Sequence, residues 1–250
     1  MYLCGHIAES RSLMSKAIIL GGSKGLGYKI AKELLSQGIT PISLSRTPPE
    51  DTQIIHVPLD LSDRGSLRPA MRLLTPHVKD VSHIIWSAGS RQKGNLFRNE
   101  EPNRIADMIE TMITYPLLLL RELLREIQSP VQFIAIGSTT AKTYKIDELL
   151  YRNVKRFQIE FAESLHLELF QENPGSRILI ANPGGMRTSF WDGSNIDHNT
   201  LALFLDAAIV SNCILETAKN QPANTVQELT LSRLGDSSGV PKKTLVTLVY

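Results

Sequence analysis

Cysteine is scarce in this 250-residue chain: Cys4 and Cys213 are the only two, and neither lies beside other cysteines or clustered histidines. This excludes a disulfide framework and a zinc-type ligand set, so we expect two reduced thiols and no bound metal. Charge of one sign is also lacking, because 27 Lys and Arg stand against 25 Asp and Glu. We therefore expect no nucleic-acid partner bound through bulk charge.

Long apolar segments are missing as well. The run that begins at Pro116 ends at Arg121, far short of the roughly 20 residues needed to cross a bilayer. The first sixteen residues carry polar and charged side chains throughout and lack the apolar core of a secretory signal. These absences predict a cytoplasmic protein with no membrane partner.

Apolar, β-rich runs alternate along the chain with longer stretches of helical period. Such alternation is typical of strand-helix-strand units around a parallel sheet. The expected strands are Lys16–Leu20, Thr40–Ser45, Gln53–Val57, Ser82–Trp86, Val131–Gly137, Ser176–Ala181 and Val226–Ser232. The expected helices are Leu26–Gln37, Asp63–Leu74, Asn103–Ile127, Asp147–Phe170 and Thr200–Ala218. The pattern predicts a Rossmann-like, doubly wound α/β/α domain of three layers with a seven-stranded parallel sheet.

Two terminal segments fall outside this alternation. Residues 1–13 precede Met14 and the first strand, and we expect a dispensable extension there that need not be ordered. The single domain is then residues 14–250. The tail from Leu234 to Tyr250 contains the apolar run TLVTLV, which is expected to dock on this domain or on a second subunit, since exposed Val and Leu are costly.

A glycine-rich turn, LGGSKGLG at residues 20–27, separates the first strand from the first helix. Gly21 suits a tight exit from the strand, Gly25 allows a pyrophosphate to approach the main chain, and Gly27 allows helix and sheet to pack closely. The helix N-terminus then faces the anion. An ordinary tight turn is the alternative, so the motif needs support from the rest of the chain.

The end of the second strand reads ISLSRT, so Ser45 and Arg46 occupy the place where an NAD-preferring fold usually presents an acid. Lys24 in the glycine turn adds a second cation. Two cations beside a 2′-phosphate make a charge-assisted site, which favours NADPH over NADH. The alternative is that both are solvated surface charges. The missing acid also argues against a methyltransferase that binds S-adenosylmethionine.

Tyr151 and Lys155 are spaced so that both side chains lie on one face of a helix, where the lysine charge can lower the pKa of the phenol. The spacing also occurs at Tyr28 and Lys32, and each tyrosine has a serine thirteen residues before it. Position in the fold separates the two sets. Ser138 follows the carboxyl end of the fifth strand, where open α/β sheets bind ligands, whereas Ser15 lies at the opposite end of the first strand.

In combination these motifs resemble the short-chain dehydrogenase/reductase family from Lys16 to Arg233. In that resemblance Ser138, Tyr151 and Lys155 fall on the catalytic serine, tyrosine and lysine. Asp60 and Leu61 match the pair beside the adenine, WSAG at 86–89 matches the motif that ends the fourth strand, and NPGGMRT at 182–188 matches the turn that holds the nicotinamide carboxamide. The implied cofactor-binding residues are Gly21, Ser23, Lys24, Gly25, Leu26, Gly27, Ser45, Arg46, Asp60, Leu61, Ser87, Ala88, Gly89, Tyr151, Lys155, Pro183, Gly184, Met186 and Thr188.

The resemblance implies that Tyr151 donates the proton during carbonyl reduction, Lys155 binds the nicotinamide ribose, and Ser138 holds the carbonyl oxygen. One position departs from the family, since Met112 stands where an asparagine usually helps a water link the lysine to solvent. A methionine cannot complete a hydrogen-bonded relay. The relay is then closed by other groups, or the rate is low, or catalysis has been lost.

The substrate is expected to be a small carbonyl compound or its alcohol, selected by the stretch after Thr188. Phe190 and Trp191 either form an apolar lid over it or pack the loop onto the domain, and His198 is expected to be a surface or capping residue. The two longest helices carry apolar residues beyond one stripe, and the resemblance implies a homodimer or homotetramer through them. The alternative function is a catalytically silent sensor or regulatory protein that binds NADP(H).

Overall fold

The sheet at the centre of the molecule has eight strands in the order β10-β9-β6-β5-β4-β1-β2-β3. The computed structural model describes residues 15–89, 95–144, 146–191, 198–233 and 244–249, so the expected N-terminal extension lies outside the described residues. The strands of this sheet are β1 (Lys16–Leu20), β2 (Thr40–Ser45), β3 (Ile55–Pro58), β4 (Val81–Trp86), β5 (Gln132–Ile136), β6 (Arg177–Pro183), β9 (Val226–Arg233) and β10 (Thr244–Val249). All seven predicted strands are present with shifts of one or two residues at their ends, and they pair in parallel.

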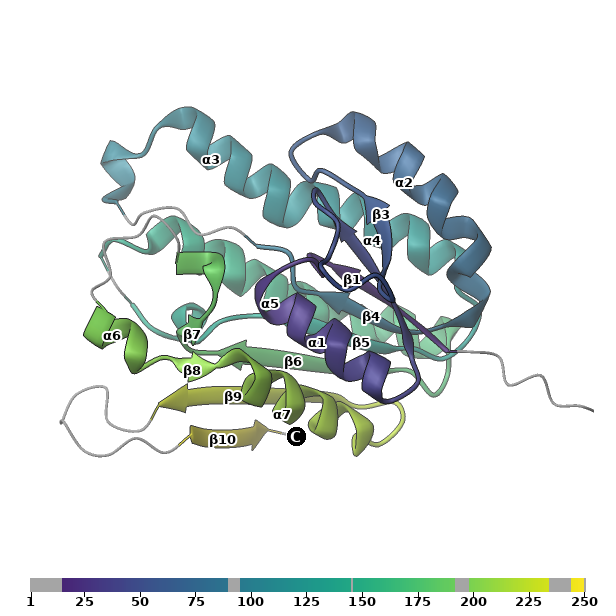
Figure 1. The fold of residues 1–250 in the computed structure, drawn as a ribbon. Coiled ribbons are helices and arrows are strands. Elements are labelled where there is room, and N and C mark those ends of the chain that lie inside the picture. Colours follow the sequence, from purple (N-terminus) through teal and green to yellow (C-terminus); the bar gives the residue numbers. More distant parts are fainter. Residues whose placement is uncertain (1–14, 90–94, 145, 192–197, 234–243, 250) are drawn as a thin grey trace, which may run out of the picture.

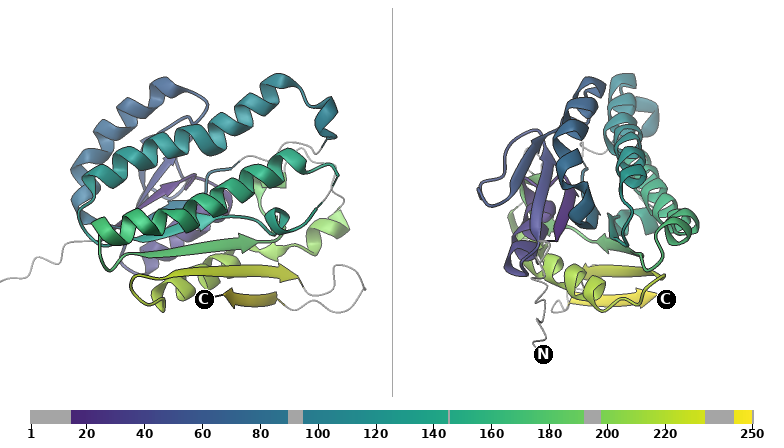
Figure 2. Two further views of the ribbon diagram at one scale, coloured as in Figure 1. Left: turned by 180° about the vertical axis from the view of Figure 1, so that it is seen from behind. Right: turned by 90° about the vertical axis from the view of Figure 1, so that its right-hand side faces the viewer.

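Helices cover both faces of the sheet and make a three-layer α/β/α sandwich (Figures 1 and 2). One face packs against α2 (Leu67–Leu74), α4 (Tyr115–Glu126) and α5 (Leu149–Glu172), and the other against α1 (Gly25–Ser36) and α7 (Ala207–Lys219). Shorter elements complete the chain: α3 (Pro102–Ile109), α6 (His198–Ala202), the two-strand pair β7 (Met186–Arg187) and β8 (Leu205–Asp206), and the turns η1 (Arg64–Ser66), η2 (Thr75–Asp80), η3 (Phe97–Asn99), η4 (Glu110–Thr114), η5 (Thr139–Lys142) and η6 (Ser189–Trp191).

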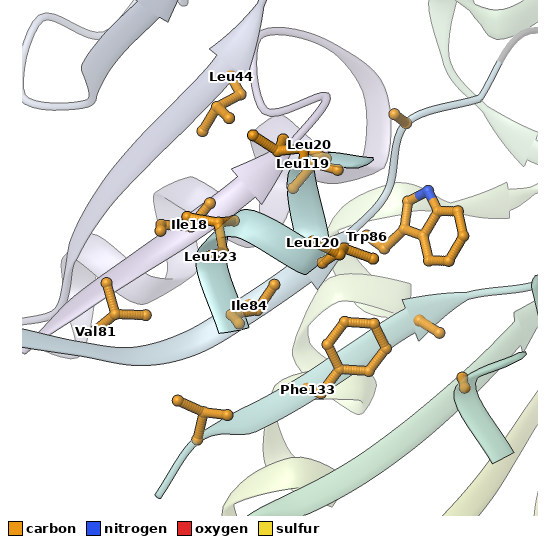
Figure 3. Close-up of a cluster of buried hydrophobic side chains, with 14 of the residues drawn as sticks. Ile18, Leu20, Leu44, Val81, Ile84, Trp86, Leu119, Leu120, Leu123 and Phe133 are labelled. Atoms are coloured by element: carbon orange, nitrogen blue, oxygen red, sulfur yellow. The ribbon is translucent and has the colours of Figure 1, made fainter. Parts of the chain in front are cut away.

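Successive side chains of a strand point to opposite faces, and in β1 both faces are buried. Ile18 and Leu20 join the cluster under α2, α4 and α5, whereas Ala17 and Ile19 join the cluster under α1 and α7. Figure 3 shows the first cluster, in which Trp86 and Phe133 come from neighbouring strands. This two-sided burial explains why the strand segments read as nearly continuous apolar runs.

The eighth strand is the tail whose partner the sequence left open. Backbone pairing joins β10 to β9 in antiparallel register, from Thr244 opposite Arg233 to Val249 opposite Glu228. The apolar tail therefore docks on its own domain, as an antiparallel edge added to the seven parallel strands.

Two predicted helices are interrupted. The segment Asn103–Ile127 is α3 and α4 joined by a π-helical turn at η4, because Pro116 has no N–H to continue the α-helical ladder. The segment Thr200–Ala218 is α6, β8 and α7. The carboxylate of Asp206 accepts a hydrogen bond from the Ala208 N–H at 2.8 Å, which caps α7 and starts a new helix there.

Candidate functional site

The site is positioned by the point where the strand order reverses. β1 lies between β2 and β4, so their connecting segments diverge beyond the carboxyl end of β1, the position at which open α/β sheets bind ligands. The glycine-rich turn leaves β1 at this edge, and the residues Ser87, Ala88 and Gly89 leave β4 beside it. The turn and the end of β4 are in contact, since a Cβ on Gly21 would lie 3.0 Å from the Ala88 Cα.

The glycine-rich turn has the geometry that a dinucleotide pyrophosphate requires. Gly25 has a φ of +58°, in the left-handed region that favours glycine, and a Cβ on Gly27 would overlap the Gly21 carbonyl oxygen. No side chain caps the first turn of α1, so its backbone N–H groups remain to bind an anion. Thr188 closes the other side, because a Cβ on Gly25 would lie 3.7–4.0 Å from its side-chain atoms. The residues present therefore fit the phosphates of an NAD(P) cofactor.

The cations predicted to select NADPH lie at the surface near this turn. Lys24 and Arg46 are both exposed. Ser45 is buried, and its hydroxyl donates to the Thr47 carbonyl at 2.9 Å. Hydrogen bonds from Ser62 hold the pKa of Asp60 below its usual value, and the positive charge of Arg46 adds to this effect. Arg46 thus lies close to the end of β3, where Asp60 and Leu61 begin the next loop.

Ser138 lies directly after β5 and caps the 3₁₀ turn η5. Its Oγ accepts a hydrogen bond from the Thr140 N–H at 3.1 Å, and its own N–H donates to the Asn182 Oδ1 at 3.2 Å. Because Thr140 uses one lone pair of the hydroxyl oxygen, the hydroxyl proton remains for another acceptor. This is the state in which a serine can donate to a substrate carbonyl oxygen.

Lys155 is brought to the same place by α5. Its side chain is buried, and its Nζ donates to the Ile136 carbonyl at 2.8 Å, two residues before Ser138. Burial lowers the pKa of Lys155 to about 7. A Cβ on Gly89 would lie 3.6 Å from this Nζ, so the lysine also reaches the end of β4.

Tyr151 lies one turn before Lys155 on the same face of α5 and is partly exposed. Its ring is 6.4 Å from that of Phe190, which follows β7. The structure thus brings together one face of α5, the end of β5 and the loop after β7, which carry Tyr151, Ser138 and Phe190. Tyr28 and Lys32 are elsewhere: Lys32 pairs with Asp51, and Tyr28 packs beside the cluster under α1 and α7.

The loop after Thr188 separates the roles of its two aromatic residues. Trp191 donates from Nε1 to the Met186 carbonyl at 2.8 Å, and its ring lies 4.9 Å from that of Phe204. Phe190 lies 5.5 Å from Trp191 and faces Tyr151. Trp191 therefore packs the loop onto the domain, whereas Phe190 lies where a substrate would meet Tyr151.

Gln158 was not among the residues that the sequence motifs indicated. In a regular helix the Met112 carbonyl would accept from the N–H of residue 116, but Pro116 has none. Gln158 on α5 supplies the missing donor, because its Nε2 lies 2.8 Å from the Met112 oxygen. Two features of the sequence could have indicated this hydrogen bond. A proline stands four residues after Met112, and a glutamine stands one turn after Lys155 on the face of the helix that becomes buried.

Met112 itself is fully buried, and its methyl carbon would lie 3.5 Å from a Cβ on Gly89, the position that Lys155 also approaches. The apolar Met112 side chain and the Lys155 ammonium group thus both approach Gly89. Gln158 places a buried amide in the neighbouring turn of α5.

Three other predicted cofactor residues lie at or directly after the carboxyl end of β6, at the same edge of the sheet. Pro183 ends β6, Met186 begins β7, and a Cβ on Gly184 would lie 3.8 Å from the Thr139 Oγ1. The described residues contain no cluster of metal-ligating side chains and no helix long and apolar enough to cross a membrane. Cys213 is a free thiol on α7. Cys4 and the side chain of His198 lie outside what the structure describes.

Comparison with known proteins agrees with this arrangement. The model of the short chain dehydrogenase family matches residues 15–199. An uncharacterized oxidoreductase of Schizosaccharomyces pombe is 29% identical over 192 residues, which are 74% of this chain and 65% of the relative, so the match spans slightly less than two thirds of that protein. The 3-oxoacyl-acyl-carrier-protein reductase of Buchnera aphidicola is 27% identical over 189 residues, 72% of this chain and 76% of the relative.

Among solved structures, a 3-ketoacyl-acyl-carrier-protein reductase from Brucella melitensis in complex with NADH has a TM-score of 0.74 at 15% identity. The alignment covers 86% of this chain and 96% of that one. At this identity the likeness concerns the fold.

Proposed function

The chain belongs to the short-chain dehydrogenase family, whose members are NAD(P)-dependent oxidoreductases, and we propose that it reduces a small carbonyl compound, or oxidises the alcohol, with NADPH as the preferred cofactor. The observation that carries the proposal is the buried Lys155 ammonium, bonded to the end of β5 beside Ser138 and one turn from Tyr151. This group lies at the same edge of the sheet as the glycine-rich turn.

The chain's own residues have separate tasks in this reaction. The cofactor, when bound, supplies or accepts the hydride. Ser138 donates a hydrogen bond from its hydroxyl to the carbonyl oxygen and so holds the substrate, and Tyr151 transfers the one proton from Oη to that oxygen. Lys155 binds the nicotinamide ribose through Nζ and favours the phenolate form of Tyr151 by its charge. Phe190 limits the space on the Tyr151 side to a flat or slender apolar substituent.

Cofactor choice is proposed to depend on Arg46 and Lys24. Both are exposed, Lys24 in the glycine-rich turn and Arg46 directly after β2, and the end of β2 carries no acid that would repel a 2′-phosphate. A cytoplasmic location is proposed as well, from the short apolar runs and the reduced thiols.

The chain is proposed to form a homodimer or homotetramer through α4 and α5. A groove of about 990 Å³ runs between these helices on their outer side, and Leu117, Leu124 and Phe161 line it. On α5, the side chain of Leu167 is 71% exposed and that of Phe157 is 39% exposed. An apolar face of this kind supports association with a second copy.

The alternative function is a catalytically silent protein that binds NADP(H), and it is favoured by Met112. A thioether beside Lys155 provides no path for a proton. The two functions share the cofactor site and differ in turnover.

The deciding experiment follows NADPH oxidation by the purified protein over a panel of aldehydes, diketones and acyl-ketones. The Tyr151→Phe variant is expected to lose turnover and to keep its NADPH affinity within a few-fold, because only the proton donor is removed. Retained turnover would remove Tyr151 from this role. Tight NADPH binding without turnover on any compound would favour the silent alternative.

A further inference from the structure

Asn182 is a completely buried polar residue near the end of β6, and its amide oxygen accepts the Ser138 N–H at 3.2 Å. The neighbouring Gly137 makes room for this contact. Any Cβ at that position would overlap the Asn182 Oδ1, which no packed atom pair tolerates. A glycine and a buried amide from different strands are therefore matched at the backbone of Ser138.

Glu228 on β9 determines which end of the Asn182 amide faces Ser138. Asn182 donates from Nδ2 to the Glu228 Oε1. A carboxylate only accepts hydrogen bonds, so the amide must present its NH₂ group to Glu228 and its oxygen to the Ser138 N–H. The reverse orientation would place two acceptors together on one side and two donors on the other.

The charge of Glu228 is compensated by Lys142, whose Nζ pairs with the same Oε1. Lys142 is the last residue of η5, the turn that Ser138 caps through Thr140. The contacts thus form a closed ring that runs from Ser138 through η5 to Lys142, then to Glu228, Asn182 and back to the Ser138 N–H.

We infer that Asn182 and Glu228 are positioning residues that hold Ser138 in place for its hydrogen bond to the substrate carbonyl. The inference rests on the proposed function, in which Ser138 contacts the substrate. Glu228 lies beyond residue 199, where the match to the family model ends, so part of the support for the site comes from β9, outside that match. Small displacements of a catalytic group are costly in rate, which gives such support a measurable effect.

The main test is a double-mutant cycle between Glu228→Gln and Ser138→Ala. The Glu228→Gln side chain keeps its size but can donate as well as accept, so the Asn182 amide is free to turn. We expect Glu228→Gln to lower kcat about tenfold and to leave the dissociation constant of NADPH within twofold. In the Ser138→Ala background the same substitution should have almost no further effect, because it acts through the serine. Glu216→Gln, at an exposed position of α7, is the matched control.

A second measurement does not depend on turnover. In protein labelled with ¹⁵N-serine, the Ser138 amide signal is identified by its loss in Ser138→Ala, and its hydrogen exchange is followed without cofactor. We expect Glu228→Gln and Asn182→Asp to speed exchange of this amide about tenfold or more, while Ser211, buried on α7, keeps its rate.

The outcomes separate the inference from the proposed function. If Ser138→Ala leaves turnover unchanged, the proposed role of Ser138 fails. If Ser138→Ala lowers turnover but Glu228→Gln changes neither kcat nor the Ser138 amide exchange, the inference alone is overturned. Equal losses from Glu228→Gln in both backgrounds would also overturn it, since they indicate a general structural effect.

Discussion

At the residue scale, the proposed chemistry depends on one buried lysine. Lys155 has its ammonium group among apolar neighbours with the Ile136 carbonyl as its partner, and burial brings its pKa to about 7 from an ordinary 10.5. Its charge is therefore poised near neutral pH. A group with this property beside Ser138 and Tyr151 is what proton transfer at a carbonyl requires.

This pKa predicts how stability changes with pH. Between about pH 7 and 10.5 the folded protein holds Lys155 neutral while the unfolded chain still binds the proton, so stability rises with pH in this window. Below pH 7 both states are protonated, so Lys155 adds no further pH dependence and the cost of burying its charge is fully present. In thermal unfolding of the cofactor-free protein, the stability of the wild type relative to Lys155→Met should therefore increase as the pH rises from 7 to 10. Lys29→Met is the control at an exposed lysine, and curves for Lys155→Met that run parallel to the wild type would contradict the prediction.

Arg46 carries the prediction on cofactor choice. An arginine beside a 2′-phosphate makes a charge-assisted contact that NADH cannot use. Arg46→Ala should weaken NADPH binding about tenfold and change NADH binding less than twofold, since hydrogen bonds to charged groups contribute roughly 1.5–3 kcal/mol. Fluorescence titration with both cofactors measures this. Arg64→Ala, at an exposed arginine of η1, is the control, and equal losses for the two cofactors would assign Arg46 another role.

At the scale of elements, the junction between η4 and α5 explains how the chain accommodates Met112. Pro116 removes one backbone donor, the helix relaxes into a π-turn, and Gln158 replaces the donor from another helix. The amide oxygen of Gln158 is buried and makes no hydrogen bond among the described residues. The Met112 carbonyl of this element thus receives a hydrogen bond from a side chain of another helix.

Gln158→Leu should destabilise the protein by about 1–3 kcal/mol, because the Met112 carbonyl loses the buried Gln158 donor. Denaturation by urea measures the loss. Arg156→Leu, at an exposed position on the same helix, should cost less than about 0.5 kcal/mol. A Gln158→Leu protein as stable as the wild type would mean that the carbonyl finds another donor.

At the scale of the whole molecule, the outer face of α4 and α5 is the surface through which we propose that a homodimer or homotetramer forms. The groove between these helices is lined by apolar side chains, of which Leu167 is mostly exposed, and by the charged residues Arg121, Arg125, Glu168 and Glu172. Charged groups are depleted from the centres of such interfaces because burying an unpaired charge is costly.

Leu167→Arg should therefore shift the protein toward the monomer by tenfold or more in dissociation constant, about 1.4 kcal/mol or more. Light scattering across a micromolar concentration range measures the change. Leu73→Arg makes the same exchange at an exposed leucine of α2 and should leave the mass unchanged. A wild type that is monomeric throughout this range would contradict the proposed assembly.

The sequence by itself determined the seven parallel strands, the helices between them and the edge at which the motifs meet. The local signals are apolar runs with period 2 or 3.6, a glycine-rich turn after the first strand, and Ser138 after the fifth. The topology of a parallel sheet brings the turn and Ser138 to the same edge. The set Tyr28 and Lys32 was separated from Tyr151 and Lys155 on this ground.

Only the tertiary structure decided the contacts between residues that are far apart in the chain. Four such contacts join segments through side chains or strand edges that have several possible partners. They are the Gln158 bond to Met112, the Asn182 bond to Ser138, the packing of Trp191 and the pairing of β10 with β9. A buried polar group must find a partner, but its sequence neighbours do not say which one, because burial and proximity arise only when the layers pack.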